Sequence, residues 1–340
     1  MNRYLQQETL YPPLISRRPS PNLEYVIVIP ALREEFVLLN LRRLEKCILP
    51  PGDGEVLLLL NQNRQADSET RQINQRVYLQ LLEWTRKVRN PRLKFFVQWL
   101  DDLPAQYEGP GLARKIGMDE ACYRLAKARS RSGWILVMDA DIKAGKHFII
   151  DLYQQAQQSK RAILIPHVPF QLQGIDQSDQ LYQAAARMDL TRWYRREILN
   201  ENVLEPQGAL WIPRNIYQKM AGLRSFNTSD WQLFLDRAKQ AKISVRAVDT
   251  SLGERVPRWA GRCSDGAGRV LRTMAKIPPS QANPIGSKSG RNASIEELVM
   301  EVLEAKGAGE GTLPKDPVKL MLHCRKMAQC SAPQKAFLKS

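Results

Sequence analysis

Apolar and polar residues alternate along this chain in blocks whose lengths match strands and helices. Short apolar runs rich in Val, Ile and Leu predict buried strands at residues 25–30, 55–60, 92–99 and 134–138. Between them, apolar residues recur at helical spacing, which predicts helices at about 36–47, 68–88 and 112–128. Strands that alternate with helices are typical of a parallel sheet with helices on both faces and right-handed crossovers.

The second half of the chain continues the pattern and then changes character. It predicts further strands at 161–166, 209–212 and 243–248, and further helices at 148–158, 176–200, near 215, at 231–240, 294–307 and 316–329. Residues 258–292 are rich in Gly, Pro, Ser and Arg, as in a loose connector. We therefore expect an N-terminal arm at 1–23, an α/β domain with a mostly parallel central sheet flanked by helices at 24–255, and a loop-rich, short-helical C-terminal extension at 256–340.

Composition and charge restrict the class of protein. The chain has 340 residues, 43% hydrophobic and 25% charged, which is ordinary for a soluble globular protein. Its net charge of +16 favours an anionic partner. The basic residues are spread along the chain, and the aromatics, at 7%, do not alternate with them, so nucleic acid is not the expected partner. Five scattered cysteines without C-x-x-C spacing argue against a zinc site and a disulfide framework, and without an apolar spanning run or signal core we expect the cytoplasm.

Two acids follow the predicted strand at 134–138, and they are the strongest candidates for chemistry. Asp139 and Asp141 stand one residue apart at its carboxyl end, which is where open α/β sheets bind ligands. A hard divalent cation would relieve the repulsion between two such carboxylates and take its other ligands from phosphate and water. The alternative is a solvated turn, in which Asp is common.

Four segments in order resemble the family 2 glycosyltransferases, which have the GT-A fold. The strand at 25–30 ends in Pro30-Ala31-Leu32-Arg33-Glu34, similar to the family's P-x-x-N-E, with Arg33 in the Asn place. The remaining matches are Asp67, Ser68 and Thr70 after the second strand, residues 109–117 (G-P-G-L-A-R-K-I-G) before the D-x-D strand, and then Gly208, Arg214, Gly222, Phe226, Asp230 and Arg237.

The resemblance implies a role for each matching residue. It implies a metal-dependent transfer of a sugar from a nucleotide-diphospho-sugar to an acceptor hydroxyl, with Mn or Mg at Asp139 and Asp141. Asp141 would be the more direct metal ligand, and Asp139 would also contact the sugar or ribose. The residues expected to border the nucleotide are Pro30, Ala31, Glu34 and Asp67, of which Glu34 could instead be a first-turn helix acid.

Two further roles carry open alternatives. Arg114 and Lys115 could bind the diphosphate at a helix N-terminus, or simply begin an exposed helix. Asp230 could be the general base that takes the acceptor's proton, which suggests inversion, or a helix N-cap.

Other partners and other functions remain open. The acceptor would be a saccharide or lipid-linked, and the helix at 176–200, with Arg187, Arg192, Arg195 and Arg196, could contact an anionic membrane at its inner face or form a solvated surface. His147 could be a third metal ligand or a surface residue, and residues 255–259 (R-V-P-R-W) resemble the Q-x-x-R-W of processive members. The rival functions are a nucleotidyltransferase on a similar fold and a non-catalytic anion-binding module.

Overall fold

The structure is a computed structural model, and it divides into two compact units. It describes residues 3–106, 110–130, 133–159, 162–172, 180–201, 204, 206, 208–224, 230–248, 253–255, 294–305 and 313–331. Unit 1 comprises Met1–Pro169 and Leu204–Val256, and unit 2 comprises Phe170–Val203 and Pro257–Ser340. No helix among these described residues is long and apolar enough to cross a membrane.

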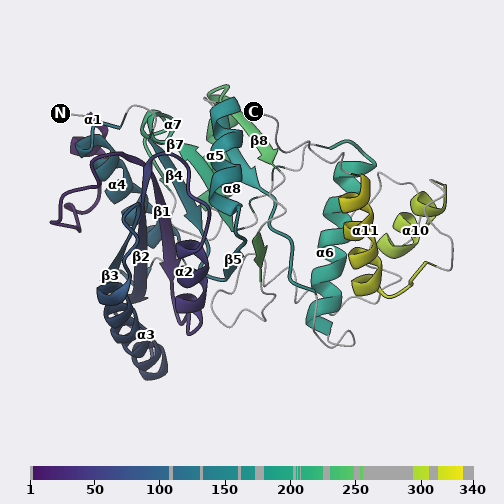
Figure 1. The fold of residues 1–340 in the computed structure, drawn as a ribbon, viewed down its shortest axis with the longest axis horizontal. Helices are drawn as coiled ribbons and strands as arrows, with labels where there is room; N and C mark the ends of the chain where they lie inside the picture. Colours follow the sequence, from purple (N-terminus) through teal and green to yellow (C-terminus); the bar gives the residue numbers. More distant parts are fainter. Residues whose placement is uncertain are drawn as a thin grey trace. The chain divides into compact units, whose positions relative to one another are not determined.

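A seven-stranded sheet organises unit 1 (Figure 1). Its order is β3-β2-β1-β4-β7-β6-β8, and only β7 runs antiparallel to its neighbours. The strands are β1 (Leu23–Ala31), β2 (Asp53–Asn63), β3 (Leu93–Leu103), β4 (Trp134–Met138), β6 (Ala162–Pro166), β7 (Ala209–Pro213) and β8 (Ser244–Val248). The predicted α/β class with a mostly parallel sheet is therefore confirmed.

Helices connect and cover these strands. In unit 1 they are α1 (Arg3–Gln7), α2 (Val37–Glu45), α3 (Ser68–Lys87), α4 (Gly111–Lys127), α5 (Phe148–Gln158), α7 (Arg214–Lys219) and α8 (Asp230–Gln240). A separate two-stranded sheet pairs β5 (Ile142–Ala144) with β9 (Gly253–Arg255). The sequence did not predict α1, β5 or β9, which are too short to show a period.

The strand order reverses between β1 and β4. From β1 the chain moves outward through β2 and β3, and then returns to place β4 on the other side of β1. Such a reversal leaves a crevice outside the carboxyl ends of the two strands, because their connections diverge to opposite sides. At this reversal β1 ends at Ala31 and Asp139 follows β4, so the general rule predicts the ligand site here.

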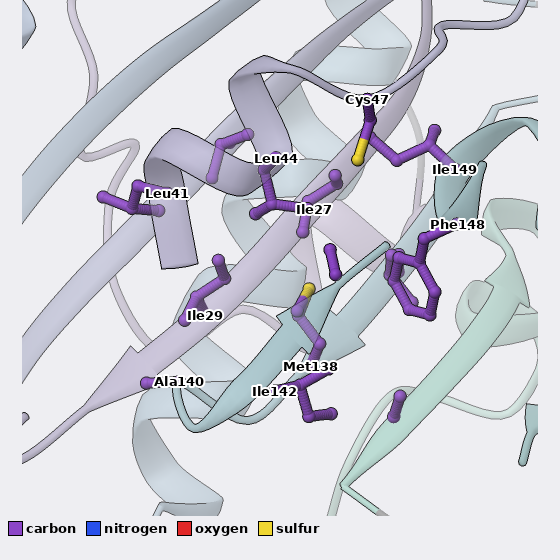
Figure 2. Close-up of a cluster of buried hydrophobic side chains, with 14 of the residues drawn as sticks. Ile27, Ile29, Leu41, Leu44, Cys47, Met138, Ala140, Ile142, Phe148 and Ile149 are labelled. Atoms are coloured by element: carbon purple, nitrogen blue, oxygen red, sulfur yellow. The ribbon is translucent and has the colours of Figure 1, made fainter. Parts of the chain in front are cut away.

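Apolar side chains fill both faces of the sheet. Figure 2 shows one face, where Leu41 and Leu44 of α2 lie over Ile27 and Ile29 of β1, with Met138 of β4 in the same cluster. On the other face α4 lies so close to the sheet that a Cβ on Gly117 would meet side-chain carbons of β1 and β2 at 2.4 Å. The glycine in the middle of α4 therefore permits this close approach.

The N-terminal arm lies across α4. The Tyr4 hydroxyl donates to Asp119 Oδ1 at 2.5 Å, and the backbone N–H of Leu14 donates to Glu120 Oε2 at 2.8 Å. Near the end of the arm, the N–H of Ser20 donates to Glu55 Oε1 at 2.9 Å. The arm thus covers polar side chains of α4 and β2 that would otherwise face water.

The described part of unit 2 contains three helices. They are α6 (Gln180–Glu197), α10 (Ile295–Ala305) and α11 (Pro317–Ser331). Their shared core includes Ala185, Leu298 and Leu320, and Arg187 of α6 forms a buried ion pair with Glu296 of α10 at 2.7 Å. These contacts place α6 with the C-terminal helices, whereas the sequence analysis included its residues in the domain at 24–255. The exact domain boundaries stay predictions.

The arginines of α6 are neutralised within unit 2. Besides the pair to Glu296, Arg192 lies 3.3 Å from Asp189, Arg195 lies 2.7 Å from Glu201, and Arg196 lies 2.7 Å from Glu197. A helix face paired in this way offers less net positive charge to an anionic surface than its sequence indicates. The membrane contact stays a prediction.

Candidate active site

The acidic segment Asp139–Asp141 follows β4, and hydrogen bonds hold the backbone of its first two residues. The Asp139 N–H donates to the carbonyl of Gly208 at 2.7 Å, and Asn40 Nδ2 of α2 donates to the carbonyl of Ala140 at 2.6 Å. Ala140 is buried in the cluster of Figure 2, while the acids on either side of it are only partly buried. The segment therefore turns its small residue inward and leaves the two acids beside it partly exposed at the carboxyl end of β4.

Arg114 links this segment to two helices. Its Nη2 donates to Asp139 Oδ1 at 2.7 Å, with side-chain exposures of 8% for Arg114 and 22% for Asp139. Its guanidinium also lies over the ring of Trp231, 5.0 Å from the centroid. The structure thus brings together a predicted phosphate-binding cation of α4, a predicted acid after β4 and the residue that follows the predicted base in α8.

Gly208 leaves room for the other oxygen of Asp139. It has a φ of +86°, and a Cβ at this position would lie 2.8 Å from Asp139 Oδ2. Glycine adopts this backbone region without strain, and any side chain here would press on the carboxylate. One oxygen of Asp139 therefore faces Arg114, and the other faces a glycine.

The residues predicted on β1 lie at the same end of the sheet. Pro30 and Ala31 are buried and pair with Leu59 and Leu60 of β2. Glu34 is half-buried in the turn before α2, and its carbonyl accepts a hydrogen bond from the N–H of Val37 at 3.1 Å. Pro30 and Ala31 can shape a pocket wall but bring no polar side chain to it.

Asp67 has a structural role as the N-cap of α3. Its Oδ1 accepts a hydrogen bond from the Thr70 N–H at 2.6 Å. This backbone hydrogen bond lowers the pKa of Asp67, whose side chain is exposed. Its predicted contact with the nucleotide stays a prediction.

Lys115 and Arg114 are both buried, so the alternative of an exposed helix start is wrong, and the predicted contact of Lys115 with a diphosphate stays a prediction. Its Nζ donates to Asp119 Oδ2 at 2.6 Å, to Tyr4 Oη at 2.9 Å and to the carbonyl of Glu8 at 2.8 Å. The side chain is only 3% exposed. Neighbouring helix positions point about 100° apart, so one faces the crevice and the other the arm. Burial of the Asp119 carboxyl raises its pKa above the ordinary value for Asp.

Of the other predicted positions, the structure describes His147 in full but Asp230 and Arg255 only by their backbone. Asp230 is the first residue of α8, and its side chain lies outside the described part of the structure. His147 is exposed at the start of α5. The backbone of Arg255 pairs with Ile142, directly after Asp141, while Gly109, Phe226, Ser229 and residues 256–259 lie outside the described residues.

A metal at this site would depend on ligands from its substrate. Within the described ranges, no three His, Cys, Asp or Glu side chains come together as a metal site. Two carboxylates one residue apart still fit a hard cation that completes its shell with phosphate and water. The space beside Asp139 Oδ2, which a Cβ on Gly208 would fill, is consistent with this.

Sequence reasoning missed two residues that shape the site. Asn40 holds the carbonyl between the acids, and Trp231 stacks on Arg114. The only signal for Trp231 was its place directly after Asp230, and Asn40 gave no signal because it occupies an ordinary helix position.

Comparisons with known proteins give only distant likenesses. No family model and no curated protein matches the chain. Among solved structures, S. aureus TarS 1-349 in complex with UDP-GlcNAc is similar, with 13% identity and a TM-score of 0.47 over 90% of this chain and 92% of that chain. S. aureus TarS has 16% identity and a TM-score of 0.43 over 82% of this chain and 43% of that chain.

Proposed function

We propose that this chain is a metal-dependent glycosyltransferase that moves a sugar from a nucleotide-diphospho-sugar to an acceptor hydroxyl, with inversion. The observation that carries the proposal is the position of Asp139 beside Arg114 at the strand reversal between β1 and β4. An acid and a cation at such a reversal suit a ligand that has both a ribose or sugar hydroxyl and a diphosphate.

The Asp139–Arg114 pair would act by exchanging partners. An arriving diphosphate competes with the carboxylate for Arg114, because a planar guanidinium can donate two hydrogen bonds to phosphate oxygens as it does to a carboxylate. Asp139 is then released toward a sugar or ribose hydroxyl. The pair thus neutralises both side chains until contacts with the ligand replace it.

The remaining residues divide the chemistry. Asp139 and Asp141 would hold Mn or Mg, which when bound supplies positive charge to the leaving diphosphate. Asp230 would take the proton of the acceptor hydroxyl as the new glycosidic bond forms. Trp231 keeps Arg114 beside the start of the helix that carries Asp230. Attack by the acceptor oxygen from the face opposite the leaving diphosphate, as the bond between the sugar and the diphosphate breaks, would invert the anomeric centre.

The direct test is release of nucleoside diphosphate from a panel of UDP- and GDP-sugars, with and without manganese. We expect release with at least one donor, dependent on the metal and stimulated by a saccharide or lipid-linked acceptor. Absence of turnover with every donor, together with no thermal shift by UDP or GDP, would contradict the proposal. Turnover of a nucleoside triphosphate with a sugar phosphate would instead identify a nucleotidyltransferase.

A further inference from the structure

The helix α2 has two faces of opposite character. Its inner face is buried, and Leu41 and Leu44 on it lie over Ile27 and Ile29 of β1 (Figure 2). At about 100° per residue, the exposed positions of α2 and its two flanking residues fall within one sector of about 120° on the opposite side. We call this the outward face of α2, and its residues are Phe36, Leu39, Arg42, Arg43 and Lys46.

Two large apolar side chains of the outward face are exposed to water. Phe36 is 63% exposed and Leu39 is 54% exposed. They stand three positions apart, so both project from the same side of the first turn. A single exposed apolar residue is common on protein surfaces, but two neighbours form a contact that a partner can remove from water.

The cations of the same face are not neutralised by acids. Arg42, Arg43 and Lys46 are exposed, and none of them forms an ion pair with a residue that the structure describes. Glu35, directly before this face, is instead paired with Arg76 of α3. The outward face of α2 therefore keeps its positive charge, whereas the arginines of α6 are paired with acids.

This combination of side chains is complementary to an anionic lipid surface. Apolar side chains of an interfacial helix insert at the boundary of headgroups and acyl chains, while Lys and Arg bind the anionic headgroups. The apolar pair projects from a convex helix, so a protein partner would need a matching pocket, whereas acyl chains adapt to any projecting side chain. The inner face of α2 is already packed, so the helix does not have to order on binding.

We propose that the outward face of α2 docks this chain on an anionic lipid bilayer, with Phe36 and Leu39 inserted and the three cations at the headgroups. The other side of the helix holds the segment after β4, because Asn40 Nδ2 donates to the carbonyl of Ala140 at 2.6 Å. A helix with its side chains is about 10–12 Å across, so docking brings that segment to about this distance from the lipid. The docking does not depend on the proposed sugar transfer.

Co-sedimentation with vesicles tests the apolar contact. The wild-type chain should bind vesicles of equal parts phosphatidylglycerol and phosphatidylcholine at least about tenfold more tightly than vesicles of phosphatidylcholine alone. Leu39→Gln should weaken binding to the anionic vesicles by about tenfold, because a Leu side chain no longer leaves water. Leu233→Gln is the matched control, 47% exposed on α8, which packs on the opposite face of the sheet, and it should bind like the wild type.

A gain of binding separates insertion from any loss of folding. Trp favours the boundary between membrane and water, so Leu39→Trp should bind the anionic vesicles about threefold more tightly than the wild type, and Leu233→Trp should not. A wild-type chain that does not bind anionic vesicles, equal losses in the two Gln variants, or no gain from Leu39→Trp would overturn the proposal.

Removal of charge tests the headgroup contact. Arg43→Gln/Lys46→Gln should weaken binding to the anionic vesicles by about 25-fold, since each cation near such a surface contributes a factor of about five. Lys219→Gln/Lys242→Gln makes the same charge change at exposed positions on and after the helices of the opposite face, where salt screens the interaction, and should have little effect. Equal losses in the two double variants, or tighter binding to polyglutamate than to anionic vesicles, would refute a lipid partner.

Discussion

At the scale of single residues, the site is held by contacts from elements far apart in the sequence. Asp139 is bound through its side chain by Arg114 and through its N–H by Gly208, and the next residue is held by Asn40. The acids could be predicted because they end an apolar run. Their partners could not, because the Arg114–Trp231 contact depends on how α4 and α8 pack, which no local pattern encodes.

Asp141 is the residue whose loss should affect the metal most directly. We expect Asp141→Ala to weaken manganese-dependent binding of UDP by at least about tenfold, because one of two carboxylate ligands is removed. Isothermal titration with UDP, with and without manganese, measures the effect. Asp101→Ala, an exposed acid at the end of β3, is the control and should bind like the wild type. Unchanged binding by Asp141→Ala would remove it from the metal site.

Asp230 should matter for transfer and not for donor binding. We expect Asp230→Asn to keep the affinity for UDP and to lose about 10²–10⁴-fold in the rate of transfer, the usual contribution of a general base. Asp236→Asn, on the same helix with a side chain 45% exposed, is the matched control. An Asp230→Asn variant with wild-type turnover would show that Asp230 is only a helix-capping residue.

At the scale of elements, the predicted strands and helices agree well with the structure where their patterns are uniform. The strand at 134–138 and the helix at 148–158 have the predicted bounds, since each is apolar or periodic throughout. Strand direction was not predictable: β7 looks like the parallel strands in sequence but runs antiparallel to β4. The packing of α6 in unit 2 could not be predicted either, because an amphipathic pattern shows that a helix has an apolar face but not which element covers that face.

The N-cap of α3 gives a pH-dependent prediction. The lowered pKa of Asp67 means that its contribution to stability is complete above the carboxylate's unfolded pKa of about 3.9 and is lost as the pH falls through the lower folded value. We expect Asp67→Ala to lower the melting temperature at pH 7, with the difference from the wild type shrinking on acidification. A difference that grows at low pH would contradict the capping role.

The buried ion pair between Glu55 of β2 and Arg124 of α4 should stabilise the folded chain, including the arm that Arg124 contacts. Arg124 and Glu55 are both 0% exposed, and Arg124 Nη1 also donates to the carbonyl of Arg17 at 3.1 Å. Arg124→Met leaves a buried charge alone and should cost about 3–5 kcal/mol in unfolding free energy, measured with urea. The double variant with Glu55→Gln should recover part of this cost. A loss below about 1 kcal/mol would show that the pair is dispensable.

At the scale of the whole molecule, the two units have separate cores. The residues with proposed roles in sugar transfer all belong to unit 1, while α6, α10 and α11 share the core of unit 2. The net charge of +16 indicated an anionic partner, yet within the described residues many of the basic side chains of α4 and α6 are paired with acids. Net charge alone therefore does not point to a binding site, whereas the end of one apolar strand predicts one.

A crystal structure of the chain with UDP and manganese tests the central claim most directly. We expect the diphosphate at the carboxyl ends of β1 and β4, with the metal on Asp141, and Arg114 turned from Asp139 toward a phosphate oxygen. UDP bound elsewhere, or a crevice with the Asp139–Arg114 pair intact at saturating UDP and manganese, would contradict it.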